Sequence, residues 1–146
     1  MNNLKQEFVA SLFNVRNRVR FAMDDQFRPL GVTDATWRTL FYLQQVGDGV
    51  QQKELARVMG IEGPSLVRLL DNLEAKDLIV RKSSLQDRRG KTIHLTRAAL
   101  PQLSSLKEIA ATVRKTLLKD ITQEELKICV RVFQKILEAP KDSEEK

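Results

Sequence analysis

Apolar residues recur at intervals of three and four along much of this chain, which is the period of an amphipathic helix. From Asn2 to about Arg28 the spacing predicts one long helix, which Pro29 and Gly31 end. Thr33 suits the position before a second helix, because its hydroxyl can accept from a free first-turn N–H. The apolar side of that second helix is predicted to be Trp37, Leu40 and Phe41, with Val46 as an open candidate.

Two shorter helices separated by a tight turn are predicted next. The first covers Gln51 to Met59 and stops at Gly60, since glycine readily adopts the left-handed backbone that ends helices. The second covers about residues 62–76, with Pro64 in its first turn, where a missing N–H costs nothing. The residues expected to face inward are Leu55, Val58 and Met59 in the first helix and Leu66, Leu70 and Leu73 in the second, with Val67 near the edge.

Two short strands and two further helices complete the pattern. The runs Leu78–Val80 and Thr92–Leu95 predict a hairpin around a polar, basic loop. Thr96 is predicted to cap a fifth helix, in which Pro101 would lie late enough to cost a hydrogen bond and bend the first turns. The segment Thr122–Glu125 is a capping-box sequence that opens a sixth helix.

The positive charge of the chain is concentrated in its middle third. The net charge is +6, and residues 51–100 hold ten Lys or Arg against six Asp or Glu, a balance of +4. A clustered positive field attracts a polyanion such as DNA, although a solvated surface is the alternative. No apolar run approaches the roughly 18 residues that span a membrane, and a signal-peptide core is lacking. A cytoplasmic protein without membrane contact is therefore expected.

The sequence offers little chemistry for catalysis or metal binding. It has one cysteine, Cys129, and one histidine, His94, so a cysteine-rich metal site is excluded. His94 is expected to face solvent from its strand, and Cys129 to pack in an apolar stripe of a core or interface rather than to sense oxidants. The sequence shows no nucleophile–base pair and no phosphate-binding loop. No enzymatic activity, metal or cofactor is predicted.

Helix, turn, helix and hairpin in this order predict a winged helix-turn-helix, mainly α with a small β-hairpin. In this arrangement one helix enters the DNA major groove and the hairpin loop, or wing, lies beside it. The striped terminal helices, at residues 1–30 and 98–140, exceed what a winged domain at residues 33–96 needs. A second copy of the chain, related by two-fold symmetry, is the simplest partner for them. One domain over residues 1–146, forming a homodimer, is predicted.

Two local motifs resemble a known family. Residues 61–79, IEGPSLVRLLDNLEAKDLI, resemble the recognition helix of the SlyA-like subgroup of the MarR family of bacterial transcriptional regulators. Residues 87–96, DRRGKTIHLT, match that family's wing pattern of Asp-x-Arg followed by a strand ending in Leu-Thr. The resemblance covers nearly the whole chain. It implies a homodimeric regulator that binds double-stranded DNA at pseudo-palindromic sites.

The outward row of the helix at residues 62–76 is the predicted major-groove surface. Free N–H groups at the helix start favour a phosphate or base edge near Ser65, and the planar guanidinium of Arg68 suits guanine. A surface ion pair, for instance with Asp71, is the alternative for Arg68. The proline is expected mainly to shape the helix start, although the resemblance allows a DNA contact. The full predicted set is Pro64, Ser65, Arg68, Leu69 and Asn72.

The loop at residues 81–91 is the predicted minor-groove contact. Arg88 and Arg89 are both candidates for insertion into a narrow groove, whose negative potential attracts a cation. Asp87 either orients one of these arginines or forms an Asx turn. The residues expected at phosphates, where contacts set affinity rather than sequence preference, are Arg81, Lys82 and Lys91, with Gln51, Gln52 and Lys53 as further candidates.

The resemblance also implies an effector. MarR-type regulators are often released from DNA by small aromatic acids held between the dimerisation helices and the winged domain. Arg20 and Trp37 fall where a cation and an aromatic wall are then expected, with Arg16 and Arg38 as further cations. The alternative is an ordinary packed Trp37 and an Arg20 that extends to water.

A protein-interaction module without DNA binding is the alternative function for a winged helix. Such a module should show apolar residues in place of Arg68 and the cluster at residues 87–91.

Overall fold

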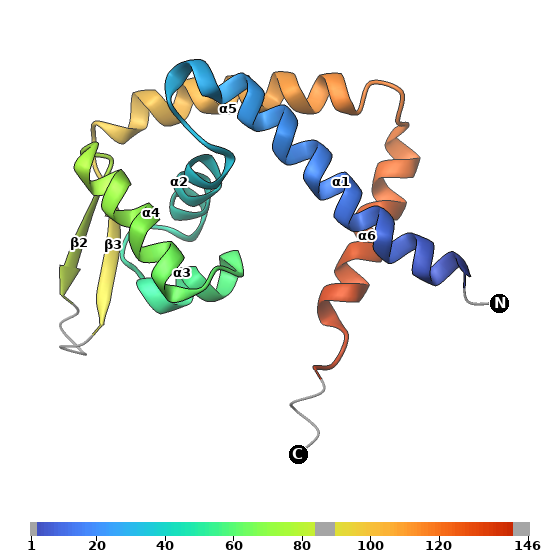
Figure 1. Ribbon diagram of the computed structural model, residues 1–146, viewed down its shortest axis with the longest axis horizontal. Helices are drawn as coiled ribbons and strands as arrows, with labels where there is room; N and C mark the ends of the chain where they lie inside the picture. Colours follow the sequence, from blue (N-terminus) through green and yellow to red (C-terminus); the bar gives the residue numbers. More distant parts are fainter. Residues whose placement is uncertain (1–2, 84–89, 142–146) are drawn as a thin grey trace. The chain divides into compact units, whose positions relative to one another are not determined.

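The computed structural model describes residues 3–83 and 90–141, and the chain divides into two compact units, residues 1–113 and 114–146. The first unit contains α1 (Asn3–Phe27), the 3-10 turn η1 (Arg28–Leu30), α2 (Asp34–Val46), β1 (Val50–Gln51), α3 (Gln52–Met59), α4 (Gly63–Ala75), β2 (Ile79–Ser83), β3 (Lys91–Leu95) and most of α5 (Ala99–Leu117) (Figure 1). The last turn of α5 belongs to the second unit, which holds α6 (Gln123–Glu138). None of the described helices is long and apolar enough to cross a membrane.

The sheet has three antiparallel strands in the order β1–β3–β2. Ile79 lies opposite Leu95 and Ser83 opposite Lys91, so the predicted hairpin is confirmed. β1 was not predicted, because the helix was expected to begin at Gln51. Two residues are too few to show the alternation that identifies a strand. Pairing of this segment with β3 therefore decides its structure.

The core of the first unit lies among α2, α3, α4, α5 and the hairpin (Figure 1). The predicted inward leucines of α4 are confirmed. Val58 is 39% exposed, so its predicted inward position was wrong. Leu55 and Met59 share one face of α3, and Val58 lies about 60° from Leu55 on the side away from Met59. The largest fully buried apolar side chains are Phe27, Leu40, Leu55, Leu66, Leu70, Leu73, Ile79, Ile93, Leu103 and Leu106.

The buried face of α2 differs from its prediction at one end. Trp37 and Leu40 are buried as expected, and Leu43 is buried as well. Val46, the open candidate, is 53% exposed in the last turn of the helix. The helix face that packs on the core therefore ends one turn before the helix does.

α5 begins at Ala99, three residues later than Thr96. The Thr96 hydroxyl accepts from the Ala99 N–H at 3.2 Å. Pro101 consequently lies in the first turn of the helix, where an N–H has no helical partner. The predicted loss of a helical hydrogen bond was wrong for this reason.

The second unit confirms the capping box at the start of α6. The Thr122 hydroxyl accepts from the Glu125 N–H, and the Glu125 carboxylate accepts from the Thr122 N–H, both at 3.1 Å. No residue of α6 is buried, and Phe133 and Leu137 are 40% and 81% exposed. Cys129 is also exposed. Its predicted packing into a core is therefore wrong for the chain by itself.

Candidate nucleic-acid interface

A tight turn joins the two short helices α3 and α4. Gly60 has a φ of 63°, which is left-handed backbone that favours glycine. The Gly60 N–H donates to the Arg57 carbonyl at 3.3 Å, and the Ile61 N–H donates to the Ala56 carbonyl at 3.1 Å. These bonds satisfy the end of α3, and α4 begins at Gly63. The predicted glycine stop is confirmed, and it sets the start of α4 beside α3.

α4 has one buried and one solvent-facing side. Leu66, Leu70 and Leu73 are fully buried. On the other side Ser65, Arg68 and Asn72 are exposed, with Leu69 half-buried and Pro64 exposed in the first turn. Within the part of the chain that the structure describes, no ion pair involves Arg68, and Asp71 bonds to Arg81 instead. The structure thus leaves an uncommitted cation in the middle of the outward row.

A groove of about 600 Å³ separates the starts of α3 and α4 from the hairpin. Lys53 and Lys91 are exposed at its walls. The buried Oε1 of Gln52 has no hydrogen-bond partner among the described residues. Residues predicted from different parts of the sequence are therefore brought to one concave surface. The groove is lined by Gln51, Gln52, Lys53, Ala56, Gly63, Leu66, Val67, Arg81, Gly90 and Lys91.

Arg81 differs from the other predicted phosphate contacts. Its guanidinium bonds to Oε2 of Glu74 at 2.5 Å and to Oδ1 of Asp71 at 2.6 Å, and only 17% of its side chain is exposed. The hydrogen bond that Arg81 donates to Glu74, with a smaller contribution from the bond it donates to Asp71, raises the pKa of Arg81 against the opposing effect of burial. Lys82 and Lys91 are exposed. The predicted wing residues Asp87, Arg88 and Arg89 lie outside the described residues.

Comparison with known proteins gives the family. A MarR family model matches residues 30–90. The crystal structure of the transcriptional regulator PA3341 matches with 37% sequence identity and a TM-score of 0.81, covering 89% of this chain and 95% of that one. The chain belongs to the MarR family. The family resemblance and the winged-helix fold, both expected from the sequence, are thereby confirmed, and the SlyA-like subgroup stays a prediction.

Two other MarR-family structures contain DNA. A mutant MarR from E. coli complexed with operator DNA has a TM-score of 0.82 at 20% identity, over 94% of this chain and 98% of that one. At this identity the likeness concerns the fold. MepR from S. aureus in a DNA complex is 29% identical with a TM-score of 0.75, over 88% and 95% of the two chains.

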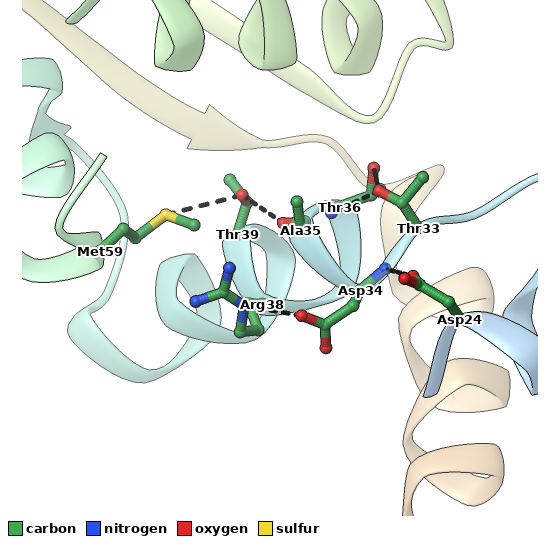
Figure 2. Close-up of polar contacts among 8 residues, drawn as sticks. All are labelled: Asp24, Thr33, Asp34, Ala35, Thr36, Arg38, Thr39 and Met59. Carbon is green, nitrogen blue, oxygen red and sulfur yellow. Dashed lines mark hydrogen bonds and ion pairs between the residues drawn. The ribbon is translucent and has the colours of Figure 1, made fainter. Parts of the chain in front are cut away.

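Of the four residues predicted to bind an effector, Trp37, Arg38 and Arg20 have partners within the first unit of this MarR-family chain, and Arg16 is exposed on α1. Trp37 is 5% exposed and packs against Phe27 and Phe41, at ring-centroid distances of 5.9 and 5.2 Å. The Arg38 Nε donates to Oδ2 of Asp34 at 3.0 Å (Figure 2). The guanidinium of Arg20 lies 5.2 Å from the ring centroid of its neighbour Phe21. The indole is thus a packed aromatic.

The structure corrects the expectation for His94, whose side chain is only 21% exposed. Its Nδ1 lies 3.0 Å from Oδ2 of Asp48, and its Nε2 lies 2.8 Å from the Thr92 hydroxyl. The Gly49 N–H bonds to the Ile93 carbonyl at 3.1 Å, which holds the turn before β1 against β3. The sequence analysis did not predict β1, and for that reason it did not predict that the turn before β1 shields the His94 ring from solvent. Within residues 3–83 and 90–141 no group of His, Cys, Asp and Glu could hold a metal ion.

Proposed function

We propose that this protein is a sequence-specific DNA-binding regulator of transcription that acts as a homodimer. The observation that carries the proposal is the outward row of α4, where exposed Arg68 stands beside a groove with lysines on its walls. A helix of this kind fits the major groove, and a planar guanidinium there suits guanine. The DNA complexes of MarR and MepR support the same function by family membership.

The groove accounts for how a DNA backbone would meet the surface. The phosphates between a major and a minor groove carry one negative charge each, and lysines attract them without reading the sequence. We assign this role to Lys53, Lys82 and Lys91. All three are exposed, and Lys53 and Lys91 line the groove. Arg88 or Arg89 would enter the minor groove from the wing. Asp87 would either orient one of these arginines or form an Asx turn.

Binding to DNA variants tests this proposal. Arg68→Ala should weaken binding to the selected site by about 1–3 kcal/mol and relax the preference at one base position per half-site. Lys91→Ala should weaken binding to every sequence and flatten the salt dependence. The sites would come from selection of bound fragments out of a genomic DNA pool. Selection that enriches nothing, or an unchanged base preference in the Arg68 variant, contradicts the proposal and favours a protein-interaction module.

The homodimer is supported by apolar side chains that the single chain leaves uncovered. Within α1 only Met23 and Phe27 are buried, and α6 buries none of its residues. Cys129 would then lie at or near the contact between copies. We therefore propose one MarR-type domain over residues 1–146. In it, residues 1–30 and 98–140 form the dimer contact, and residues 33–96 form the winged helix-turn-helix. Light scattering should give about twice the chain mass, and a stable monomer that binds one half-site tightly would contradict this.

Release by a small aromatic carboxylate is the remaining part of the proposal. It is supported by the family resemblance and by the cations Arg16 and Arg20 on α1, the helix whose Phe27 packs against Trp37 of α2. A ligand can weaken DNA binding only by its differential affinity for the two states, typically about 1–3 kcal/mol. Calorimetric titration with salicylate, with and without the selected DNA, measures this coupling. Equal affinities in the two titrations would remove the effector and leave the DNA-binding proposal intact.

A further inference from the structure

We propose that Arg81 is a positioning residue, which holds the β2–β3 hairpin against α4 and thereby fixes the spacing between the recognition helix and the wing. The inference rests on the proposed DNA-binding function. It replaces the sequence-based expectation that Arg81 contacts a phosphate.

The geometry places Arg81 as a bridge between two elements. Asp71 and Glu74 are three positions apart on α4 and so share one face of that helix. Both bond to Arg81, which lies in the middle of β2 opposite Ile93 on β3. The planar guanidinium can serve two carboxylates at once through different N–H groups, which a lysine cannot do as well. The two bonds therefore fix the orientation of the guanidinium between β2 and α4, in addition to pairing opposite charges.

The position of the bridge along the hairpin gives it leverage on the wing. At its base the hairpin is held by the Leu78 N–H, which donates to the Leu73 carbonyl at 3.0 Å, and by buried Ile79. Arg81 lies two residues farther along β2, toward the wing. A bond at this point restricts rotation of the hairpin about its base. The contacts at the base restrict this rotation less strongly by themselves.

The local charge argues against a phosphate contact at Arg81. Its single positive charge faces two carboxylates within 2.6 Å, so the cluster carries a net charge of −1. A phosphate approaching this cluster meets two like charges for one opposite charge. Lys91, in contrast, is exposed on the neighbouring strand. The two residues should thus differ in how salt affects the binding that each supports.

Salt-dependent DNA titrations of the full chain separate the two roles. Arg81→Ala should lower affinity for the selected site by about ten-fold or more and leave the slope of log affinity against log salt unchanged. Lys91→Ala, the matched control, should reduce the slope by about 0.9. Arg81→Lys, which keeps the charge but not the two-way geometry, should also lose affinity. A slope reduced equally in Arg81→Ala and Lys91→Ala would overturn the proposal.

Removing the carboxylate of Glu74 should change DNA affinity in the direction opposite to the one that net charge predicts. Glu74→Gln makes the protein more positive, so a purely electrostatic view predicts tighter binding to every DNA. Positioning by Arg81 instead predicts weaker binding to the selected site and no loss on unrelated DNA. Glu62→Gln, an equal charge change at the exposed start of α4, is the control and should not weaken the selected site. Tighter binding by both variants would contradict positioning.

A measurement without DNA keeps this inference separate from the proposed function. Spin labels at Glu62 and Ser83, in a Cys129→Ser background, would report the distance between α4 and the outer end of β2. Arg81→Ala should broaden the distance distribution relative to the parent protein. An unchanged distribution overturns the positioning role whether or not the protein binds DNA. A broadened distribution in a protein that selects no DNA would contradict the proposed function alone.

Discussion

The backbone N–H of Asp34 donates a 2.6 Å hydrogen bond to Oδ1 of Asp24, so the first residue of α2 is held by a carboxylate from α1 (Figure 2). The Thr33 hydroxyl accepts from the Thr36 N–H at 3.1 Å, which satisfies a second free N–H of the same turn. A negative charge at this end also complements the helix dipole. The start of α2 is therefore capped by Thr33, the residue directly before it, and by Asp24 of the preceding helix α1.

Removal of the Asp24 carboxylate should loosen this junction. Asp24→Ala leaves the Asp34 N–H without its acceptor, and we expect the free energy of unfolding to fall by about 1–2 kcal/mol. Asp24→Asn keeps an acceptor oxygen at the same place and should lose less. Urea unfolding curves of the two variants measure the difference. Equal losses would show that the charge of Asp24 matters and its hydrogen bond does not.

The stability of the first unit should depend on pH through Asp34. Burial raises the pKa of Asp34, the charge of Asp24 adds to this, and Arg38 opposes it. A carboxyl with a raised folded-state pKa binds its proton more tightly when folded. The contribution of Asp34 to the free energy of unfolding is therefore complete below the ordinary carboxyl pKa, and it is lost as pH rises through the folded-state pKa.

Asp34→Asn isolates that contribution. As pH rises from the ordinary carboxyl pKa of about 4, the wild-type free energy of unfolding should fall relative to that of the variant, until Asp34 is ionised in the folded state as well. Asp25→Asn, at an exposed carboxylate of α1 that pairs with Arg28 of η1, is the control. Parallel curves for wild type and Asp34→Asn would refute the assignment.

The capping box should control the first turn of α6. Thr122→Ala removes the side-chain acceptor of the Glu125 N–H and should cost about 1 kcal/mol of local helix stability. Thr122→Ser keeps the hydroxyl and is the matched control. Hydrogen exchange of the first-turn amides reports the effect. Exchange rates that are the same in both variants would argue that the box contributes nothing.

The same box predicts an acid-sensitive helix start. Hydrogen bonds from the Thr122 backbone and side chain lower the pKa of Glu125. A lowered folded-state pKa gives stability that is present above the ordinary pKa and lost as pH falls through the folded-state value. Protection factors of the first-turn amides of α6, which are corrected for slower intrinsic exchange in acid, should therefore fall as pH falls, and Glu125→Gln should remove this dependence. A pH profile that survives the substitution would point to another group.

The two sides of α4 should respond differently to truncation. Leu70 is fully buried, so Leu70→Ala should lower the free energy of unfolding by about 2–5 kcal/mol. Val67 is 37% exposed beside the groove, and Val67→Ala should cost less than about 1 kcal/mol. Thermal unfolding of the two variants makes the comparison. Similar losses would mean that the groove wall is part of the core.

Features set by neighbouring residues were predictable from the sequence. Thr33, Gly60 and the Thr122–Glu125 box act within one turn of their own helices, so spacing and residue type identified them. The inward leucines of α4 followed from helical periodicity for the same reason. These local signals were sufficient for the helix-turn-helix and for the family resemblance.

Features set by distant residues were not predictable in the same way. β1 exists because of its pairing with β3, and the cover over His94 depends on that pairing. The partners of Arg81 and the acceptor for Asp34 come from other elements. A single sequence shows which charges and hydrogen-bonding groups are present, whereas the fold decides which of them meet. The sequence was thus sufficient to propose the candidate surface, but it did not show that the guanidinium of Arg81 is bonded to Asp71 and Glu74.

The direct succession of β1 and α3 limits how the length of this chain can change. β1 ends at Gln51 and α3 begins at Gln52, with no residue between them. One inserted residue here would either turn the helix by about 100°, which moves Leu55 out of the core, or reverse the side-chain faces of the strand. The turn at residues 47–49 lies in neither element and is tied to β3 by single contacts, the Gly49 N–H bond to Ile93 and the pair of Asp48 with His94. Natural insertions and engineered tags in this part of the protein should be tolerated at that turn and rejected a few residues later.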